Sequence, residues 1–329
     1  MTDAPVRWGI LGTGMIAAEF SGALERSSVA TLSAVASRSL GRAEAFTEGR
    51  DGARAYGSYE ELVSDPAIEA VYIATPQHRH RDDALLAIGH GKHVVVEKPL
   101  VLNSSDAETI AQELGDRPTL AIEGMWTLFN PLVSQLLGLV DSGSLGALRA
   151  FTANAGPIGV PRGHRALTAE LGGSFLWECL VYPLAILTAV DSGFHEPASI
   201  AATSQRTADG TDFATAVLLS RDTSFAQFGG SFAADSSGAA PSAAQLQFEN
   251  AWVELREIYS PAELTIGWND GRVEHFTVDS AAAGFAYEIE GVSAAVRQRA
   301  PLDHRLLLAH TMQNIALLER IQGAAAVRP

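Results

Sequence analysis

The chain is poor in lysine and cysteine. Its 329 residues include only two lysines, one of which is Lys98, and a single cysteine, Cys179. One cysteine excludes an intrachain disulfide, which is compatible with a reducing compartment, and we expect a cytoplasmic protein. The 38 acidic residues outnumber the 23 basic ones, and the net charge of −15 argues against nucleic acid as a partner, because phosphate binding needs clustered cations.

The chain also lacks a long apolar run. Its first five residues are polar, and residues 8–11 are too few for a secretory signal, so we expect none. The most apolar stretch, residues 175–190, carries Glu178 and Pro183 and falls short of a membrane span. A buried helix is therefore predicted there, and no membrane partner is expected. With 47% hydrophobic residues, a chain of this length should form two domains with sizeable cores.

A glycine-rich turn follows the first predicted strand, residues 6–11. It is followed in turn by a helix-forming stretch at residues 18–25. In a dinucleotide-binding fold the first glycine makes the tight turn, the second lets the backbone approach a pyrophosphate, and a small third residue, here Ala17, lets helix and strand pack closely. The helix N-terminus then favours the anion. A glycine turn without a ligand is the alternative. The predicted cofactor contacts in this turn are Gly12, Thr13, Gly14, Met15 and Ile16.

The second predicted strand, residues 31–36, ends without an acidic side chain. An acidic residue at this place would bind the adenosine ribose of NAD, but the chain has Ser37 and Arg38, with Arg42 as a possible second cation. A serine hydroxyl and a guanidinium both suit a 2′-phosphate. The sequence therefore favours NADP, with NAD possible. Alternatively, the two arginines are only the solvated face of a helix.

Two further strand ends carry polar residues. Residues 70–74 lead into Thr75-Pro76 and His80, and the apolar run 93–96 leads into Glu97-Lys98. Strands that alternate with helices through residue 122 predict a doubly wound parallel sheet, which binds ligands outside the carboxyl ends of its strands. We therefore interpret Thr75, Pro76, His80, Glu97 and Lys98 as cofactor-site residues. Lys98 is the first catalytic candidate, although it could simply cap a strand and pair with a carboxylate.

The second half of the chain has the alternating pattern of β-strands. Residues 1–122 are therefore assigned to a Rossmann domain, and residues 123–329 to an α+β domain with a large, mostly antiparallel sheet. The open face of that sheet should be apolar enough to make a homodimer or homotetramer through residues 199–278. Residues 235–242 are expected to form a loop. The predicted strands are 148–155, 199–205, 214–220, 225–232, 245–248, 252–256, 263–266 and 273–278, and the predicted helices are 285–298 and 303–321.

Taken together, the motifs resemble those of the Gfo/Idh/MocA oxidoreductase family. The resemblance rests on Gly12 to Ala17, Ala74-Thr75-Pro76 with His80, Glu97-Lys98-Pro99, the segments 123–131 and 172–178, and Tyr182-Pro183. It implies an NAD(P)-dependent oxidoreductase that transfers a hydride between the nicotinamide and a hydroxyl or carbonyl carbon of a sugar, polyol or cyclic diol. The branch that it resembles includes dihydrodiol dehydrogenases and NADP-dependent sugar dehydrogenases.

The same resemblance assigns catalytic residues. Lys98 matches the family's lysine, Glu178 falls on an aspartate position, and Tyr182 falls on a His or Tyr position. Residues four apart share one face of a helix, so Glu178 and Tyr182 should meet Lys98 between the two domains. Candidate substrate contacts are Trp126, Arg162, His164, Glu178 and Tyr182; no metal is expected, because none of the histidines has metal-ligand spacing.

Three departures from the family pattern leave a second function open. Glu178 is longer than the expected aspartate, Leu180 replaces a usual glycine, and Leu128 replaces a frequent arginine. The alternative function is a dinucleotide-binding regulator or sensor with little or no turnover.

Overall fold

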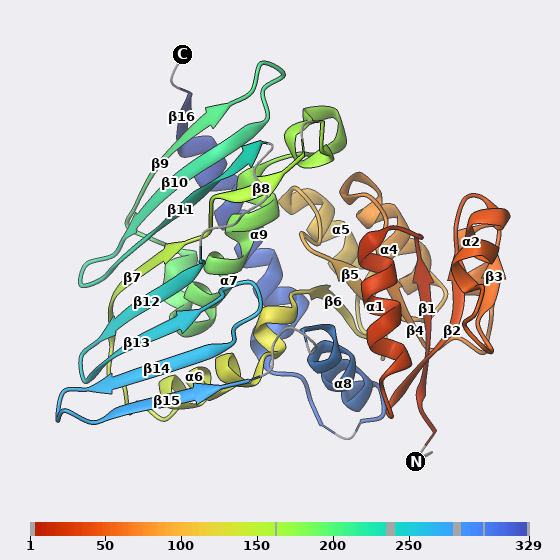
Figure 1. Cartoon of the computed structure of the whole chain (residues 1–329), viewed down its shortest axis with the longest axis horizontal. Helices are drawn as coiled ribbons and strands as arrows, with labels where there is room; N and C mark the ends of the chain where they lie inside the picture. Colours follow the sequence, from red (N-terminus) through yellow and green to blue (C-terminus); the bar gives the residue numbers. More distant parts are fainter. Residues whose placement is uncertain (1–3, 162, 235–240, 279–283, 299, 328–329) are drawn as a thin grey trace. The chain divides into compact units, whose positions relative to one another are not determined.

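The protein folds as two compact units. The computed structural model describes residues 4–161, 163–234, 241–278, 284–298 and 300–327. The first unit comprises Met1–Trp126 and Ala283–Met312, and the second comprises Thr127–Ala282 and Gln313–Pro329 (Figure 1). The predicted domain boundary at residue 122 leaves out the segment Ala283–Met312, in which the chain returns to the first unit after the second sheet.

The first unit is a six-stranded parallel sheet with helices on its faces. Its strand order is β3-β2-β1-β4-β5-β6, so the chain winds outward from β1 in both directions. This confirms the predicted doubly wound Rossmann domain. Its strands are β1 (Val6–Leu11), β2 (Ala30–Ala36), β3 (Arg54–Tyr56), β4 (Ala70–Ile73), β5 (His93–Glu97) and β6 (Ala121–Gly124). Its helices are α1 (Met15–Glu25), α2 (Leu40–Thr47), α3 (Tyr59–Ser64), α4 (His80–Gly89), α5 (Ser104–Leu114) and α8 (Gly284–Val296).

Aromatic packing explains why α8 belongs to the first unit. Phe20 of α1 stacks on Tyr72 of β4 with ring centroids 3.6 Å apart, and Phe285 of α8 meets Phe20 edge-on at 5.5 Å. Trp8 of β1 donates a hydrogen bond from Nε1 to Ser293 Oγ of α8 at 3.3 Å. Burial of these large rings favours the docking of a helix that lies far along the sequence.

The second unit contains a ten-stranded sheet. Its order is β15-β14-β13-β12-β7-β11-β10-β9-β16, with β8 paired to β11; the β11 pairs with β7 and β8 and the β16–β9 pair are parallel, and the other pairs are antiparallel. Its strands are β7 (Leu148–Asn154), β8 (Ile158–Val160), β9 (Ser199–Arg206), β10 (Asp212–Ser220), β11 (Phe225–Ala234), β12 (Ala243–Phe248), β13 (Ala251–Arg256), β14 (Glu263–Trp268), β15 (Val273–Thr277) and β16 (Ala325–Val327).

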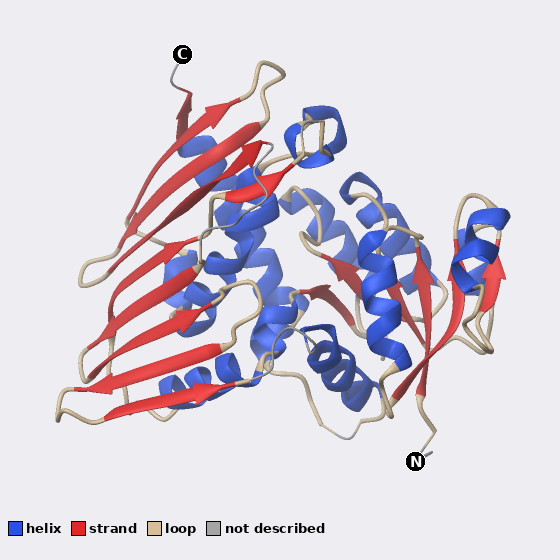
Figure 2. Cartoon of the chain, in the orientation of Figure 1, coloured by secondary structure: helices blue, strands red, loops and turns tan. Residues whose placement is uncertain are grey.

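The predicted mostly antiparallel sheet is thus confirmed, and each of the eight predicted strands is present. Sequence reasoning missed the three-residue strands β8 and β16. The predicted loop at residues 235–242 lies largely outside the described residues. The other helices are α6 (Pro131–Asp141), α7 (Val181–Val190) and α9 (Leu308–Ala324), within which the division between the units falls. Figure 2 shows that the helices of the second unit lie along one face of its sheet.

Short helical turns complete the chain. They are η1 (Gln77–Arg79), η2 (Trp126–Phe129), η3 (Arg165–Leu167), η4 (Ala169–Leu171), η5 (Leu176–Leu180, a π-helix), η6 (Ser192–His195) and η7 (His304–Leu306). The stretch Ala169–Val190 is long and apolar enough to cross a membrane by composition alone, yet its most apolar window is entirely buried in the protein. Every residue of α7 is buried, which confirms the predicted buried helix.

Candidate active site

The glycine turn after β1 has the geometry that its sequence predicts. Gly12 has a φ of +110°, and a Cβ at this residue would lie 2.7 Å from Ala74 O, so only glycine fits. Gly14 is the N-cap of α1, with no side-chain cap and no acidic residue in the first turn. A Cβ at Gly14 would meet nothing within 4 Å. The N-terminus of α1 therefore has no side-chain cap and has open space beside Gly14, which suits a pyrophosphate.

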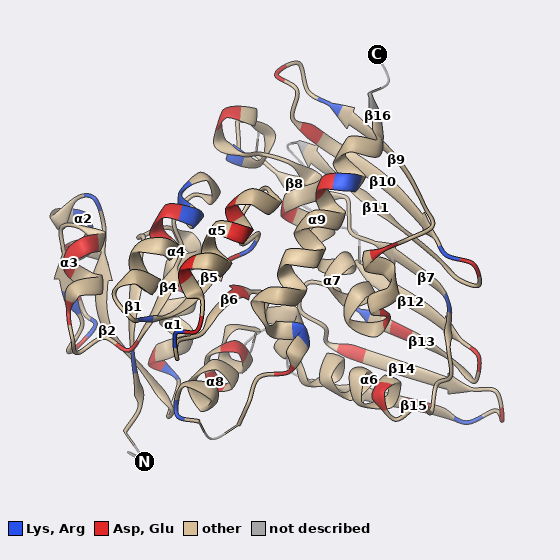
Figure 3. Cartoon of the chain, turned by 180° about the vertical axis from the view of Figure 1, so that it is seen from behind, with Lys and Arg blue, Asp and Glu red and all other residues tan. Residues whose placement is uncertain are grey.

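The end of β2 offers a hydroxyl and two cations. Ser37 is buried, and its Oγ accepts a hydrogen bond from Ser39 N at 3.4 Å. Arg38 and Arg42 are exposed. Figure 3 shows acidic and basic residues interspersed along the chain, and other arginines of the first unit, such as Arg54 and Arg79, pair with carboxylates. Among the described residues, neither Arg38 nor Arg42 forms a salt bridge, so both remain available to a phosphate.

The loop after β4 is fixed by a buried aspartate. Asp83 of α4 is fully buried; its Oδ2 accepts from Thr75 Oγ1 at 2.7 Å, and its Oδ1 accepts from Arg79 Nη2 at 2.7 Å. Pro76, which follows Thr75, is exposed. The Thr75-Pro76 segment is thus held as a rigid edge at the carboxyl end of the sheet, where the sequence predicts the cofactor.

His80 holds backbone rather than presenting a ring nitrogen to a ligand. The residue is only 1% exposed. Its Nδ1 lies 2.9 Å from Pro99 O and its Nε2 lies 2.9 Å from Thr75 O. Burial is the main reason why the pKa of His80 is lowered, and the carbonyl contacts oppose it. We therefore revise the predicted role of His80 from cofactor contact to positioning: it ties the Thr75 loop to the segment that carries Lys98.

Lys98 stands at the carboxyl end of β5, as predicted. It is half-buried and follows Glu97, whose Oε1 accepts from Tyr72 and whose Oε2 accepts from Lys98 N at 3.1 Å. Its positive charge also acts on Glu123 at the end of β6. Glu97 is thereby occupied with protein groups at the edge of the site.

Glu123 is a titratable residue that sequence reasoning did not single out. Its Oε1 accepts from Leu100 N at 2.9 Å. Burial raises its pKa to about 7, against the lowering effects of that bond and of Lys98, while Glu97 raises it further. Its position near the carboxyl end of β6 could have pointed to it, because β6 is the parallel neighbour of β5, which carries Lys98 at its own carboxyl end.

The second unit carries Glu178 and Tyr182 on consecutive helices. Glu178 lies in the π-helix η5, and Tyr182 lies in the first turn of α7. The Glu178 side chain is 8% exposed, and its Oε1 accepts from Arg165 Nη1 at 2.6 Å. Glu178 is therefore held in an ion pair with an arginine.

Tyr182 rests on a second tyrosine. It is 6% exposed and meets Tyr259 edge-on, with centroids 4.9 Å apart. Tyr259 OH donates to Ala155 O at 2.5 Å, and burial raises the pKa of Tyr259. Tyr259 lies in the β13–β14 loop, and nothing in the sequence pattern pointed to it. Leu180 is completely buried, so it fills core space at the position of the family glycine.

The remaining substrate candidates have structural partners. Trp126 packs edge-on against Phe285 at 4.6 Å. His164 caps η3, since its Nδ1 accepts from Ala166 N at 3.3 Å. Arg162 lies outside the described residues. The candidates form two groups: the glycine turn, Thr75, Glu97 and Lys98 lie along strand ends of the first unit, while Glu178 and Tyr182 lie in the second.

Comparison with known proteins adds to this geometry. Residues 6–123 match an oxidoreductase family with an NAD-binding Rossmann fold. The mouse trans-1,2-dihydrobenzene-1,2-diol dehydrogenase is 30% identical over 263 residues, which are 79% of this chain and 78% of that protein. The pig enzyme of the same name is 36% identical over 218 residues, 65% of this chain, and the match spans only 64% of that enzyme's length.

Two solved structures share the fold. The 3-ketoreductase KijD10 from Actinomadura kijaniata, crystallised with NADP and TDP-benzene, has a TM-score of 0.80 at 24% identity, covering 99% of this chain and 100% of its own. The UDP-N-acetylglucosamine 3-dehydrogenase GnnA from Acidithiobacillus ferrooxidans has a TM-score of 0.81 at 17% identity, covering 98% of each chain.

Proposed function

The chain belongs to the Gfo/Idh/MocA oxidoreductase family, and from this premise we propose that it is an NADP-dependent dehydrogenase or reductase acting on CH-OH groups. It transfers a hydride between the nicotinamide and a hydroxyl or carbonyl carbon of a sugar, polyol or cyclic diol. The relatives named as dihydrodiol dehydrogenases support a diol, and the ketoreductase and dehydrogenase of similar fold support a sugar. The observation that carries the proposal is Lys98 at the carboxyl end of β5, in the same parallel sheet as β1, whose carboxyl end leads into α1.

The residues of the first unit fit a dinucleotide. The open amides at Gly14 suit the pyrophosphate, and Ser37, Arg38 and Arg42 suit a 2′-phosphate. Thr75, Pro76 and Lys98 then line the strand ends toward the nicotinamide. When bound, the nicotinamide supplies or accepts the hydride.

The proton of the substrate hydroxyl is the task of the protein. We assign it to Lys98 and Tyr182, whose ammonium and phenol forms can donate it and whose amine and phenolate forms can accept it. Glu178 pairs with Arg165 and is therefore assigned to positioning. The assignment requires the two units to bring Lys98 and Tyr182 to one substrate.

The Glu178–Arg165 ion pair also favours the alternative of a dinucleotide-binding regulator or sensor, because a carboxylate committed to an arginine is not available as a proton relay. One experiment separates the two. The protein is mixed with NADP and a panel of sugars, polyols and trans-dihydrodiols, and nicotinamide absorbance is followed. Turnover of at least one substrate supports the enzyme. NADP binding without turnover across the panel supports the regulator.

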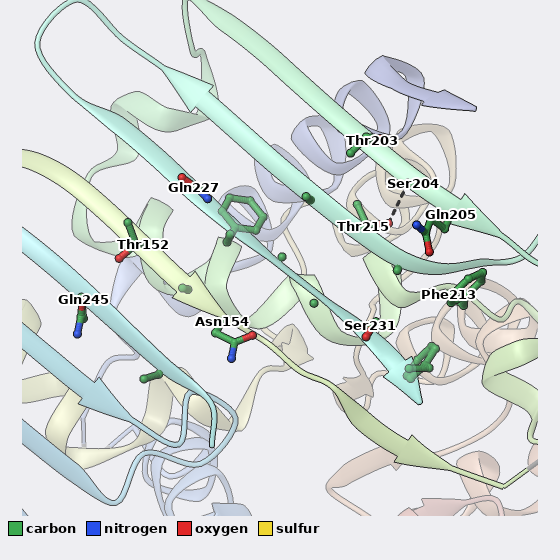
Figure 4. A pocket seen from close by; sticks show the side chains of 18 residues that line it. Thr152, Asn154, Thr203, Ser204, Gln205, Phe213, Thr215, Gln227, Ser231 and Gln245 are labelled. Atoms are coloured by element: carbon green, nitrogen blue, oxygen red, sulfur yellow. Dashed lines mark hydrogen bonds between the residues drawn. The ribbon is translucent and has the colours of Figure 1, made fainter. Parts of the chain in front are cut away.

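The sheet of the second unit supports self-association. On its open face Leu218, Phe225 and Trp252 are 44%, 42% and 42% exposed. A hollow of about 900 Å³ on the same face is lined mainly by small and uncharged polar residues (Figure 4), including Thr152, Asn154, Gln205, Gln227 and Gln245. A face with few charges and three exposed large apolar side chains suits burial against a second copy, as a homodimer or within a homotetramer.

A further inference from the structure

Glu288 of α8 is a buried carboxyl without a hydrogen-bond partner. It is 0% exposed, and neither of its carboxyl oxygens is hydrogen-bonded to any described residue. A carboxylate in such a place would lose its hydration without compensation, so the neutral acid is favoured. Burial raises the pKa of Glu288 well above its ordinary range, and repulsion from Glu97 and Glu123 adds to this.

The three neighbouring carboxyls differ in the donors that they receive. Glu97 accepts from two groups, Tyr72 OH and Lys98 N, whereas Glu123 accepts from Leu100 N. Glu288 accepts from none of the described residues. Because donated hydrogen bonds stabilise the ionised form, Glu123, which receives one, is more readily ionised than Glu288, which receives none from the described residues.

Few other charges reach this cluster. The helix α8 packs on α1 and near β2. The acidic residues of α1, Glu19 and Glu25, are exposed, β2 has no titratable side chain, and Glu290 of α8 is exposed. The charges that act on Glu123 are those of Lys98 and Glu97, and the charges that act on Glu288 are those of Glu97 and Glu123.

We infer that Glu123 and Glu288 form a buried proton store beside Lys98, in which Glu288 stays a neutral acid while Glu123 gains and loses its proton. Glu123 is thereby a positioning residue that sets the charge next to Lys98 at the end of β5. Its relevance to catalysis rests on the proposed function, because Lys98 is there assigned to the substrate proton.

The sign of the coupling follows from charge. When Glu123 is ionised it attracts the Lys98 ammonium and raises the pKa of that amine. When Glu123 is protonated this attraction is lost. Since burial raises the pKa of Glu123 to about 7, the exchange falls near neutral pH.

Amine labelling of the protein alone tests the inference. Only two lysines occur in the chain, and Lys92, which donates to Asp65 O and Ile68 O, serves as the internal reference. A limiting acylating reagent is applied across a pH series, and mass spectrometry of the two lysine peptides gives the pKa of Lys98. In Glu123→Gln that pKa should fall by about one unit or more, which makes Lys98 roughly tenfold more reactive at a fixed pH below its pKa.

Two neutral substitutions serve as matched comparisons. Glu288→Gln replaces an acid that is already uncharged, so the Lys98 titration should not move. The exposed Glu290→Gln on the same helix should also leave it unchanged. An unchanged Lys98 titration in Glu123→Gln, or a shift in Glu288→Gln as large as that in Glu123→Gln, would overturn the inference.

Infrared spectra of the unmutated protein test the same inference without any variant, so they apply even if a variant fails to fold. The unmutated protein at pH 8 should show the carbonyl stretch of a protonated carboxylic acid, and a second such band should titrate near neutral pH. If the band of a protonated carboxylic acid is absent at pH 8, Glu288 is not a neutral acid and the inference is wrong. Neither measurement uses NADP or substrate, so a failure here is distinguishable from a failure to find turnover.

Discussion

Arg38→Ala should remove most of the preference for NADP over NAD. Arg38 is exposed, directly follows the buried Ser37 at the end of β2, and forms no salt bridge with any described residue. Its guanidinium is therefore free to bind a 2′-phosphate, a group that NAD lacks. The substitution should leave the glycine turn and its pyrophosphate contacts unchanged.

The size of the effect follows from exposure. A hydrogen bond to a charged group contributes about 1.5–3 kcal/mol when shielded, and an exposed ion pair contributes roughly 0.2–1 kcal/mol. Because Arg38 is exposed, we take about 1–2 kcal/mol, which corresponds to an increase of about 5- to 30-fold in the Kd for NADP. The Kd for NAD, which lacks the 2′-phosphate, should change less than about twofold.

Calorimetric titration with both cofactors, at low and high salt, measures these changes. Screening should weaken the NADP preference of the unmutated protein at high salt. Arg117→Ala is the matched control, because Arg117, just beyond the end of α5, is exposed but pairs with Glu113 of that helix. Equal Kd values for the two cofactors in the unmutated protein, or an unaltered preference in Arg38→Ala, would refute the reasoning.

Four other outcomes are expected. Lys98→Met and Tyr182→Phe should each reduce kcat by about 100-fold or more, with NADP affinity nearly unchanged, and the double variant should be little worse than either; full activity in Tyr182→Phe would identify Tyr182 as packing. Gly12→Ala should abolish NADP binding in a titration or prevent folding by circular dichroism, because its Cβ would collide with Ala74 O; tight binding would contradict this. Light scattering at micromolar concentration should give at least a dimer mass, and a monomer mass would rule out the proposed interface. Finally, Glu123→Gln should lose less stability than the unmutated protein as the pH rises from 5 to 8. Folding raises the pKa of Glu123 from 4.5 to about 7, so its protonated form contributes about 3 kcal/mol to the free energy of unfolding below pH 4.5, and this contribution is lost as the pH rises through 7. Denaturant titrations at several pH values would detect the difference.

Local patterns predicted most of the fold. The glycine turn, the apolar strands of the first sheet and the alternating strands of the second depend on neighbouring residues in the sequence, and each is present. The short strands β8 and β16 were missed because three residues carry too little periodicity. The docking of α8 was also missed, since it depends on the rings of Phe20 and Phe285, which are far apart in sequence.

The same distinction applies to the candidate site. Lys98, Glu178 and Tyr182 were singled out because their local motifs resemble those of the family, and their catalytic roles stay predictions. Their partners were not, because burial beside a distant residue leaves no sequence signal: Tyr259 packs on Tyr182 from the β13–β14 loop, and Glu288 enters the first unit from α8. Whether Lys98 and Tyr182 share one substrate stays a prediction.

The ion pair between Glu178 and Arg165 bears on the proposed role of Glu178 in catalysis. Glu178 is one methylene longer than the family aspartate, and its 8% exposed carboxylate contacts a guanidinium that is itself 49% exposed. Arg165→Met would leave the nearly buried carboxylate of Glu178 without this donor, so the substitution should disturb the η5 turn that precedes Tyr182. The contact with Arg165 fixes the position of this carboxylate. It can orient a substrate hydroxyl by accepting a hydrogen bond, but taking up a proton would cost it the attraction of Arg165. This agrees with the proposal that Lys98 and Tyr182 handle the substrate proton while Glu178, which accepts from Arg165, has a positioning role.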